Sequence, residues 1–226
     1  MQGVNKSYLV FDASNSHIVV GIFGTGTESS RTRFALRESF QLIIPEIQLA
    51  LAKAGIKKPD AIVSAIGPGS FTGIRIGVSA ARNLAQLWDI PVIGINSLSF
   101  YGFQIRMTQS EPFAICIDGK QKRFYTKFVT GRGIDSIEAA ETLDLTWTEI
   151  EQELTNNQIQ HVYCNDPTKL TIANLEPRPV PEPEARALFD AAMALNLQER
   201  TWADLLPHYH RKNPAEQKHP EGIKRI

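Results

Sequence analysis

Two aspartates in this sequence follow apolar stretches that have the pattern of strands. Asp12 ends the stretch Tyr8–Phe11, and Asp118 ends the stretch Phe113–Ile117. Paired acids at strand ends could hold Mg²⁺ and phosphate in a cleft, but catalysis would also require complete glycine-rich loops after both strands, and the polar turns here do not supply them. We therefore expect turn-forming aspartates that remain from a nucleotide site, and no catalytic residue in this chain.

A glycine-rich segment, Gly67-Pro-Gly-Ser-Phe-Thr-Gly-Ile-Arg-Ile-Gly77, is the most distinctive motif. Such a loop between a strand and a helix can aim backbone N–H groups at an anion, so Gly67, Gly69 and Ser70 are candidates for the same vestigial nucleotide site. The segment lacks the GK[ST] ending of a P-loop, and its glycine spacing is one residue too long for a dinucleotide fingerprint. Neither nucleotide motif is complete.

Apart from one pair, the histidines and the possible nucleophiles show no spacing that indicates a catalytic or metal site. Only His208 and His210 have a spacing compatible with a metal, and both lie in a segment that we expect to be solvated. No Ser-His-Asp arrangement can be argued from the sequence. We expect no metal and no resident cofactor, with ATP or ADP at a subunit interface as the alternative.

The elements that must position these residues alternate between strand and helix. Apolar runs predict strands, and an apolar residue every three or four positions predicts helices over about 38–54 and 72–88. Helices between strands imply crossover connections and a partly parallel sheet, so the fold class is α/β.

The second half of the chain begins like the first, with an apolar strand, an aspartate, a polar turn and a second strand. This order indicates a weak internal repeat, although two coincidental hairpins would look the same. We expect an N-terminal lobe over residues 1–108 and a smaller, degenerate lobe over 109–206. Residues 207–226 form a basic tail, and the proline-rich stretch 176–183 a stiff connector.

The two predicted helices of the first lobe carry more apolar surface than one sheet can cover. Small residues on adjacent turns of the second helix would also let another helix approach closely. Both features predict a partner interface. Burial of the apolar surface under the second lobe is the alternative, and the small residues could equally serve packing on the chain's own sheet. The candidate interface residues are Phe40, Ile43, Ile47, Gly73, Ile76, Gly77, Ala80 and Asn83.

The net charge, the cysteines and the lack of long apolar runs exclude several classes of protein. The 226 residues carry a formal net charge of zero, which argues against a free-standing nucleic-acid binder. Cys116 and Cys164 lie in apolar stretches and should be buried thiols. With no signal peptide and no run long enough to span a bilayer, we expect a soluble, cytoplasmic protein without a membrane contact.

The aspartate turns and the glycine-rich motif resemble the TsaB (YeaZ) family of bacterial tRNA threonylcarbamoyladenosine biosynthesis proteins. Pro207-x-Tyr209-x-Arg211 matches a further landmark in the same order. The resemblance implies a two-lobed actin-like ATPase (ASKHA, RNase H-like) fold with mixed sheets flanked by helices.

The resemblance also implies a scaffold role without catalysis. Members bind the TsaD (Kae1-type) catalytic subunit through helices of the first lobe, and the TsaE ATPase, in the complex that modifies adenosine 37 of tRNA. TsaD holds a metal through an HxxxH motif, whereas Ser39 and Ile43 stand at the corresponding positions here. Many TsaB members keep the first histidine, so the serine leaves any role of that position in doubt.

Three further expectations stay open. Without its partner the chain should form a homodimer through the same helices. It should meet tRNA only in the assembled complex, where the basic tail is the candidate contact. The competing function is a free-standing ATPase or small-molecule kinase of the actin and sugar-kinase class.

Overall fold

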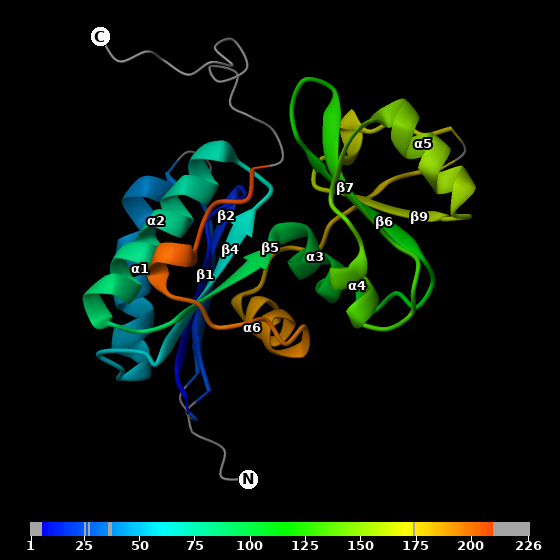
Figure 1. Ribbon diagram of the computed structural model, residues 1–226. Helices are drawn as coiled ribbons and strands as arrows, with labels where there is room; N and C mark the ends of the chain where they lie inside the picture. Colours follow the sequence, from blue (N-terminus) through cyan, green and yellow to red (C-terminus); the bar gives the residue numbers. More distant parts are fainter. Residues whose placement is uncertain (1–5, 25, 27, 36–37, 174, 210–226) are drawn as a thin grey trace.

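The chain folds into two lobes, each built on a five-stranded mixed sheet (Figure 1). This computed structural model describes residues 6–24, 26, 28–35, 38–173 and 175–209. The first sheet has the order β3-β2-β1-β4-β5. Its strands are β1 (Tyr8–Asp12), β2 (His17–Phe23), β3 (Ser29–Phe34), β4 (Ala61–Gly67) and β5 (Val92–Asn96).

The second sheet has the order β10-β9-β6-β7-β8. Its strands are β6 (Phe113–Asp118), β7 (Arg123–Val129), β8 (Leu143–Thr146), β9 (His161–Cys164) and β10 (Arg178–Pro179). Read from β8 to β10, the order of connections is the same as in the first sheet. In both lobes an antiparallel hairpin leads the sheet and a parallel strand follows on its other side.

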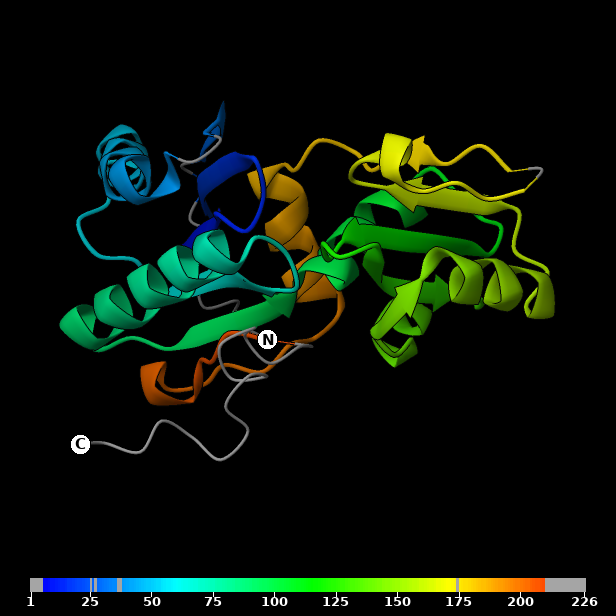
Figure 2. The ribbon, with the colours of Figure 1, turned by 90° about the horizontal axis from the view of Figure 1, so that it is seen from above.

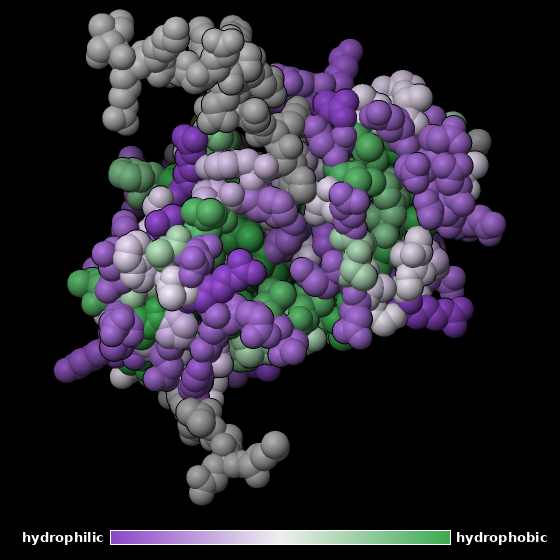
Figure 3. All heavy atoms as spheres, in the orientation of Figure 1, coloured by the Kyte–Doolittle hydropathy of each residue, from purple (hydrophilic) through white to green (hydrophobic). Residues whose placement is uncertain are grey.

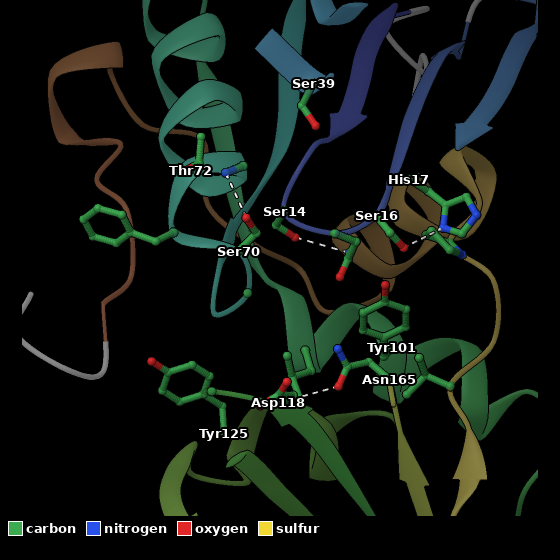
Figure 4. A pocket seen from close by; sticks show the side chains of 18 of the residues that line it. Ser14, Ser16, His17, Ser39, Ser70, Thr72, Tyr101, Asp118, Tyr125 and Asn165 are labelled. Carbon is green, nitrogen blue, oxygen red and sulfur yellow. Dashed lines mark hydrogen bonds between the residues drawn. The ribbon is translucent and has the colours of Figure 1, made fainter. Parts of the chain in front are cut away.

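The repeat expected from the sequence is therefore confirmed, and with it a two-lobed α/β fold with mixed sheets flanked by helices. Asp12 ends β1 and Asp118 ends β6, so the two aspartates hold equivalent places in the two sheets. Each aspartate is the last residue of the strand from which its hairpin turns back, and Figure 4 shows Asp118 at the cleft between the lobes.

Helices α1 (Ser39–Ala54) and α2 (Phe71–Trp88) cover the outer face of the first sheet (Figure 1). Alternate residues of β1 separate the two faces: Leu9 and Phe11 pack under α1 and α2, whereas Val10 packs on the opposite side. That opposite side is covered by α3 (Ser97–Arg106) and α6 (Ala185–Ala194). The period of two that predicted these strands thus places a core on each face of the sheet.

The second sheet is covered in the same way. Helix α5 (Trp147–Asn156) packs against one face through Ile150 and Leu154, in the cluster that also holds both free cysteines. The expectation of buried thiols is confirmed. Helix α4 (Asp135–Ala139) and α3 cover the other face, and a single apolar cluster continues from there to the first sheet.

The end of the chain differs from the predicted division into lobes. Helix α6 packs on β1 and β2 of the first sheet, and Trp202–Asp204 (η2) packs on α2. Residues 185–206 therefore lie with the first lobe and not with the second, because α6 buries Ala185, Leu188 and Ala191 between that sheet and α3 (Figure 2). Most of the basic tail, with His210 and Arg211, lies outside the described residues.

Two stretches contain short elements. The acidic stretch 134–153 includes α4 and β8, and buries Ile137. The proline-rich stretch contributes the two-residue edge strand β10, as an edge position allows for proline. No described helix is long and apolar enough to cross a membrane.

Candidate functional site

A cleft of about 990 Å³ separates the two lobes. The first lobe contributes the β1–β2 turn and the beginnings of α1 and α2, and the second contributes the β6–β7 turn, Tyr125 and Asn165 (Figure 4). Tyr101 of α3 and the proline-rich segment complete the wall. Hydroxyl and amide side chains prevail in this lining: Ser14, Asn15, Ser16, Ser39, Ser70, Thr72, Tyr101, Gln121, Tyr125 and Asn165.

Asp12 organises the β1–β2 turn from behind. The backbone N–H of Ser14 donates to its Oδ1 (2.7 Å between N and Oδ1), and the side-chain amide of Asn15 donates to its Oδ2 (2.9 Å). Burial raises the pKa of this carboxyl, against the lowering effect of those hydrogen bonds. Asp12 is only 1% exposed and does not line the cleft. Its role is that of a turn-forming residue.

The glycine-rich motif packs against that same turn. Ser70 caps α2 by accepting a hydrogen bond from the backbone N–H of Gly73, and its own backbone N–H donates to the carbonyl oxygen of Ser14 (2.8 Å). A Cβ on Gly69 would lie 2.6 Å from the Ser14 carbonyl oxygen, and one on Gly73 would collide with the Ala13 carbonyl. These glycines therefore allow a close approach within the chain.

Gly67 has a different requirement. Its φ of +105° lies in the region that side chains rarely adopt, so glycine is needed for the turn out of β4. It does not line the cleft, whereas Gly69 and Ser70 do.

Asp118 is held by cations. Its Oδ2 lies 2.8 Å from Nζ of Lys120 and 2.9 Å from Nζ of Lys169, and its Oδ1 accepts the backbone N–H of Lys120. Burial by itself would raise the pKa of Asp118, but the hydrogen bonds from Lys120 and Lys169 outweigh it and lower the pKa to about 2. The carboxylate is charged at neutral pH and already neutralised by two ammonium groups.

The two equivalent aspartates thus fail as a pair of magnesium ligands. Asp12 points its oxygens into its own turn, and Asp118 binds lysines instead of leaving oxygens to a metal. Within the described part of the chain, no group of three or more His, Cys, Asp or Glu side chains could hold a metal ion. These residues do not fit a magnesium nucleotide, so we derive no phosphoryl-transfer step.

Five of the eight predicted interface residues are covered by the chain itself. Ile43 and Ile47 pack in the core under α1, and Ala80 packs in the same core under α2. Gly73 abuts the Ala13 carbonyl, and Gly77 faces Ala13 and Ser64 of its own lobe. These five residues therefore form no exposed surface in this structure, because the small-residue stripe of α2 meets the β1–β2 turn and the sheet of the same chain.

The other three predicted interface residues, Phe40, Ile76 and Asn83, remain accessible at least in part. Phe40 is 79% exposed, and it lines the cleft together with Ile76. Leu87 at the far end of α2 is 75% exposed, and Ile44 and Leu49 of α1 are each about 40% exposed. Apolar surface on α1 and α2 therefore exists, but on different residues from most of those predicted.

Several residues in or next to the cleft were not identified from the sequence. Tyr101 lies inside a helix that carried no motif, and Lys169 reaches Asp118 across 51 residues of chain. Asn165 was detectable in principle, because it directly follows β9 and the ends of parallel strands meet at one sheet edge. It accepts the backbone N–H of Asp118 (2.7 Å to Oδ1).

Comparison with known proteins places this geometry in a family. The sequence model of the tRNA N6-adenosine threonylcarbamoyltransferase family, TsaD, matches residues 32–169, more than half of the chain. The tRNA threonylcarbamoyladenosine biosynthesis protein TsaB of Haemophilus influenzae is 32% identical over 124 residues, and TsaB of Escherichia coli is 35% identical over 92. The chain belongs to the family that this TsaD model describes, and it is similar in sequence to TsaB proteins.

The alignments with these TsaB relatives cover only part of each chain. The first alignment spans 54% of this chain and 52% of the relative, and the second 40% of each, so the matches cover about half of the curated relatives or less. A crystal structure of a Pseudomonas aeruginosa protein described as similar to peptidase YEAZ has a TM-score of 0.70. It is 19% identical and covers 91% of this chain and 100% of that one, which shows a shared fold.

The two positions that the resemblance aligns with the HxxxH histidines are buried within the chain. Ser39 is buried and its hydroxyl donates to the carbonyl oxygen of Ala35, and the Ile43 side chain packs in the core. Neither side chain offers a metal ligand at this place in α1. The beginning of α1 instead presents Phe40 to the cleft.

Proposed function

We propose that this chain is a non-catalytic subunit of the machinery that forms N6-threonylcarbamoyladenosine at position 37 of tRNA. It would bind and activate a TsaD-type catalytic subunit together with the TsaE ATPase, and would pair with a copy of itself when alone. The family assignment supports the pathway. The observation that carries the subunit role is the exposed apolar surface on α1 and α2.

That surface is unusual for a helix pair that covers a sheet. Phe40, Ile44 and Leu49 lie on α1, and Leu87 on α2, and each is more than a third exposed although the core beneath is already full. Figure 3 shows hydrophobic residues at the outer edge of the first lobe, where Figure 1 places these helices. Exposed large apolar side chains on two neighbouring helices favour a protein contact there.

The surface is also continuous with the cleft. Phe40 and Ile76 line the cleft from the first lobe, so a partner seated on α1 and α2 would border its mouth. The aspartates do not supply a magnesium site, which disfavours the competing ATPase or kinase. A partner's own residues would then perform the chemistry.

Binding to a TsaD-type subunit tests the proposal. Phe40→Ser and Leu87→Ser should each weaken the complex about tenfold or more in size-exclusion chromatography and calorimetric titration, because large apolar side chains at interfaces dominate affinity. Leu206→Ser is the matched control, since Leu206 is 61% exposed but lies outside both helices. It should leave the affinity unchanged.

Two results would contradict the proposal. One is an absence of any complex between the wild-type chain and the catalytic subunit at micromolar concentration. The other is equal weakening by Leu206→Ser and the two helix variants, which would mean that the loss does not report on α1 and α2. Formation of the modified nucleoside in tRNA by the reconstituted proteins gives the functional readout.

A further inference from the structure

Lys127 is a buried charge on an apolar face of the second sheet. It lies in β7 between Tyr125 and Val129, whose side chains point to the same face, and it is only 3% exposed. Every other lysine that the structure describes is at least partly exposed. Burying an ammonium group is costly, and an apolar side chain at this place would avoid the cost, so the lysine needs a specific reason.

The ammonium group of Lys127 is bonded across the junction between the lobes. Its Nζ donates to Oγ of Ser99 (2.9 Å) and to the carbonyl oxygen of Ile137 (2.9 Å), and the Ser99 hydroxyl donates in turn to Oε2 of Glu138 (2.9 Å). Burial lowers the pKa of Lys127, and the Glu138 carboxylate partly offsets that effect. Ser99 lies in the first turn of α3, directly after β5, whereas Lys127 and Glu138 belong to β7 and α4. One hydroxyl therefore joins the end of the first sheet to two charged groups of the second lobe.

The same end of α3 makes a second bond between the lobes. Oδ1 of Asn96 accepts the backbone N–H groups of Leu98 and Ser99, which fixes the side-chain amide, and its Nδ2 donates to Oγ1 of Thr142 (3.3 Å). Figure 1 shows α3 between the two sheets, with α4 beside it. Polar groups of both lobes thus meet at the first turn of α3.

The apolar contact between the lobes is continuous but not directional. One cluster runs from Val10 of the first sheet through Phe103 of α3 to Ile115 of the second sheet. Apolar burial depends on contact area and therefore tolerates a range of neighbouring orientations, whereas hydrogen bonds of defined length and direction select one of them. In some proteins, buried polar groups specify a single arrangement at a cost in stability.

We propose that Lys127, Ser99 and Glu138 form a latch that fixes the orientation of the second lobe relative to the first. Lys127 is a positioning residue in this role, because it acts through the hydroxyl of Ser99 and the carbonyl group of Ile137. The latch lies within one chain and requires neither a ligand nor a partner. Its test is therefore independent of the function proposed above.

Distance measurements between spin labels on the two lobes test the latch in the full chain. Lys53 of α1 and Asn156 of α5 are exposed, so labels can be attached to Lys53→Cys and Asn156→Cys while the two native cysteines stay buried. Pulsed electron paramagnetic resonance should give a narrow distance distribution when the latch is intact. Lys127→Met keeps a side chain of similar length without the charge, and it should broaden the distribution about twofold or more while Tm stays the same or rises.

Lys57→Met is the matched control, since it removes the charge of an exposed lysine in the loop after α1 and should leave the distribution narrow. Glu138→Gln changes only the charge at the exposed end of the latch, so it should fold even if Lys127→Met does not, and it too should broaden the distribution.

The inference is overturned if Lys127→Met, or Glu138→Gln where Lys127→Met does not fold, gives the same distribution as Lys57→Met. A lower Tm of Lys127→Met with an unchanged distribution would also overturn it, because the bonds would then act on stability and not on orientation.

Discussion

Gly73 and Gly77 lie one turn apart in α2, yet the structure predicts opposite effects when each is changed to alanine. A Cβ on Gly73 would stand within 3.0 Å of the Ala13 carbonyl oxygen, a separation that real Cβ atoms essentially never show. A Cβ on Gly77 would find its nearest neighbours, the Cβ and N of Ala13, at 3.8 Å, which is ordinary contact.

The size of each effect follows from these distances. Overpacking costs about 1–3 kcal/mol, and the upper end applies at Gly73 because the obstructing atom belongs to the backbone and cannot rotate away. Alanine recovers up to about 1 kcal/mol of helix propensity at either position. Gly73→Ala should therefore lose about 2 kcal/mol of unfolding free energy, and Gly77→Ala should gain about 0.5–1 kcal/mol.

Thermal unfolding followed by circular dichroism measures both changes. For a chain of this length, about 2 kcal/mol corresponds to a Tm lowered by about 4–8 °C, and Gly77→Ala should raise Tm by about 1–4 °C. Urea titrations should show a shifted midpoint and an unchanged slope, as expected when stability alone changes.

The two variants control for each other, since both replace a glycine with the same residue in one helix. A Tm for Gly73→Ala equal to or above that of the wild type would refute the packing argument. A clear loss of stability in Gly77→Ala would refute the conclusion that this face of α2 has room for a methyl group.

Two further predictions concern buried charge. Asp118 has a folded-state pKa of about 2, below its ordinary value of 3.8, so the unfolded chain takes up the proton first and stability should fall as the pH drops from about 4 toward about 2. Asp118→Asn should reduce that acid dependence in urea titrations, and an unchanged dependence would show that the lysine pairs do not act on stability. Arg106→Met should cost about 3 kcal/mol or more, because the guanidinium of the wild type donates to four backbone carbonyls, those of Gln109, Ser110, Glu111 and Gly131. Arg106→Lys should recover part of the loss, and equal stability of Arg106→Met and the wild type would contradict the role of these bonds.

The strands and helices of the first lobe were predictable to within a residue or two. The helix expected at 72–88 is Phe71–Trp88, and the one expected at 38–54 is Ser39–Ala54, with Gly55 as its stop. Periodicity and capping depend on residues that are neighbours in sequence, and so they can be read without the fold. The internal repeat was visible for the same reason, since each hairpin is a local unit.

The candidate site was predicted less well. Asp12, Gly69, Ser70 and Asp118 do gather at the two lobe edges, but the directions of their contacts were not visible. Whether the glycines of α2 face a ligand, a partner or the chain itself depends on where the β1–β2 turn lies, about 60 residues away in the sequence. Lys169, which helps to neutralise Asp118, lies 51 residues further along the chain, so its contact could not be inferred from local sequence.

The sequence by itself determined the order of strands and helices within residues 1–108, the placement of both aspartates in turns, and the apolar excess of α1 and α2. Only the tertiary structure decided which apolar residues of those helices stay exposed, that α6 returns to the first sheet, and that Tyr101 meets the cleft. The physical reason is that burial and hydrogen-bond partnership are properties of contacts between distant segments, whereas periodicity and turn chemistry are properties of neighbouring residues.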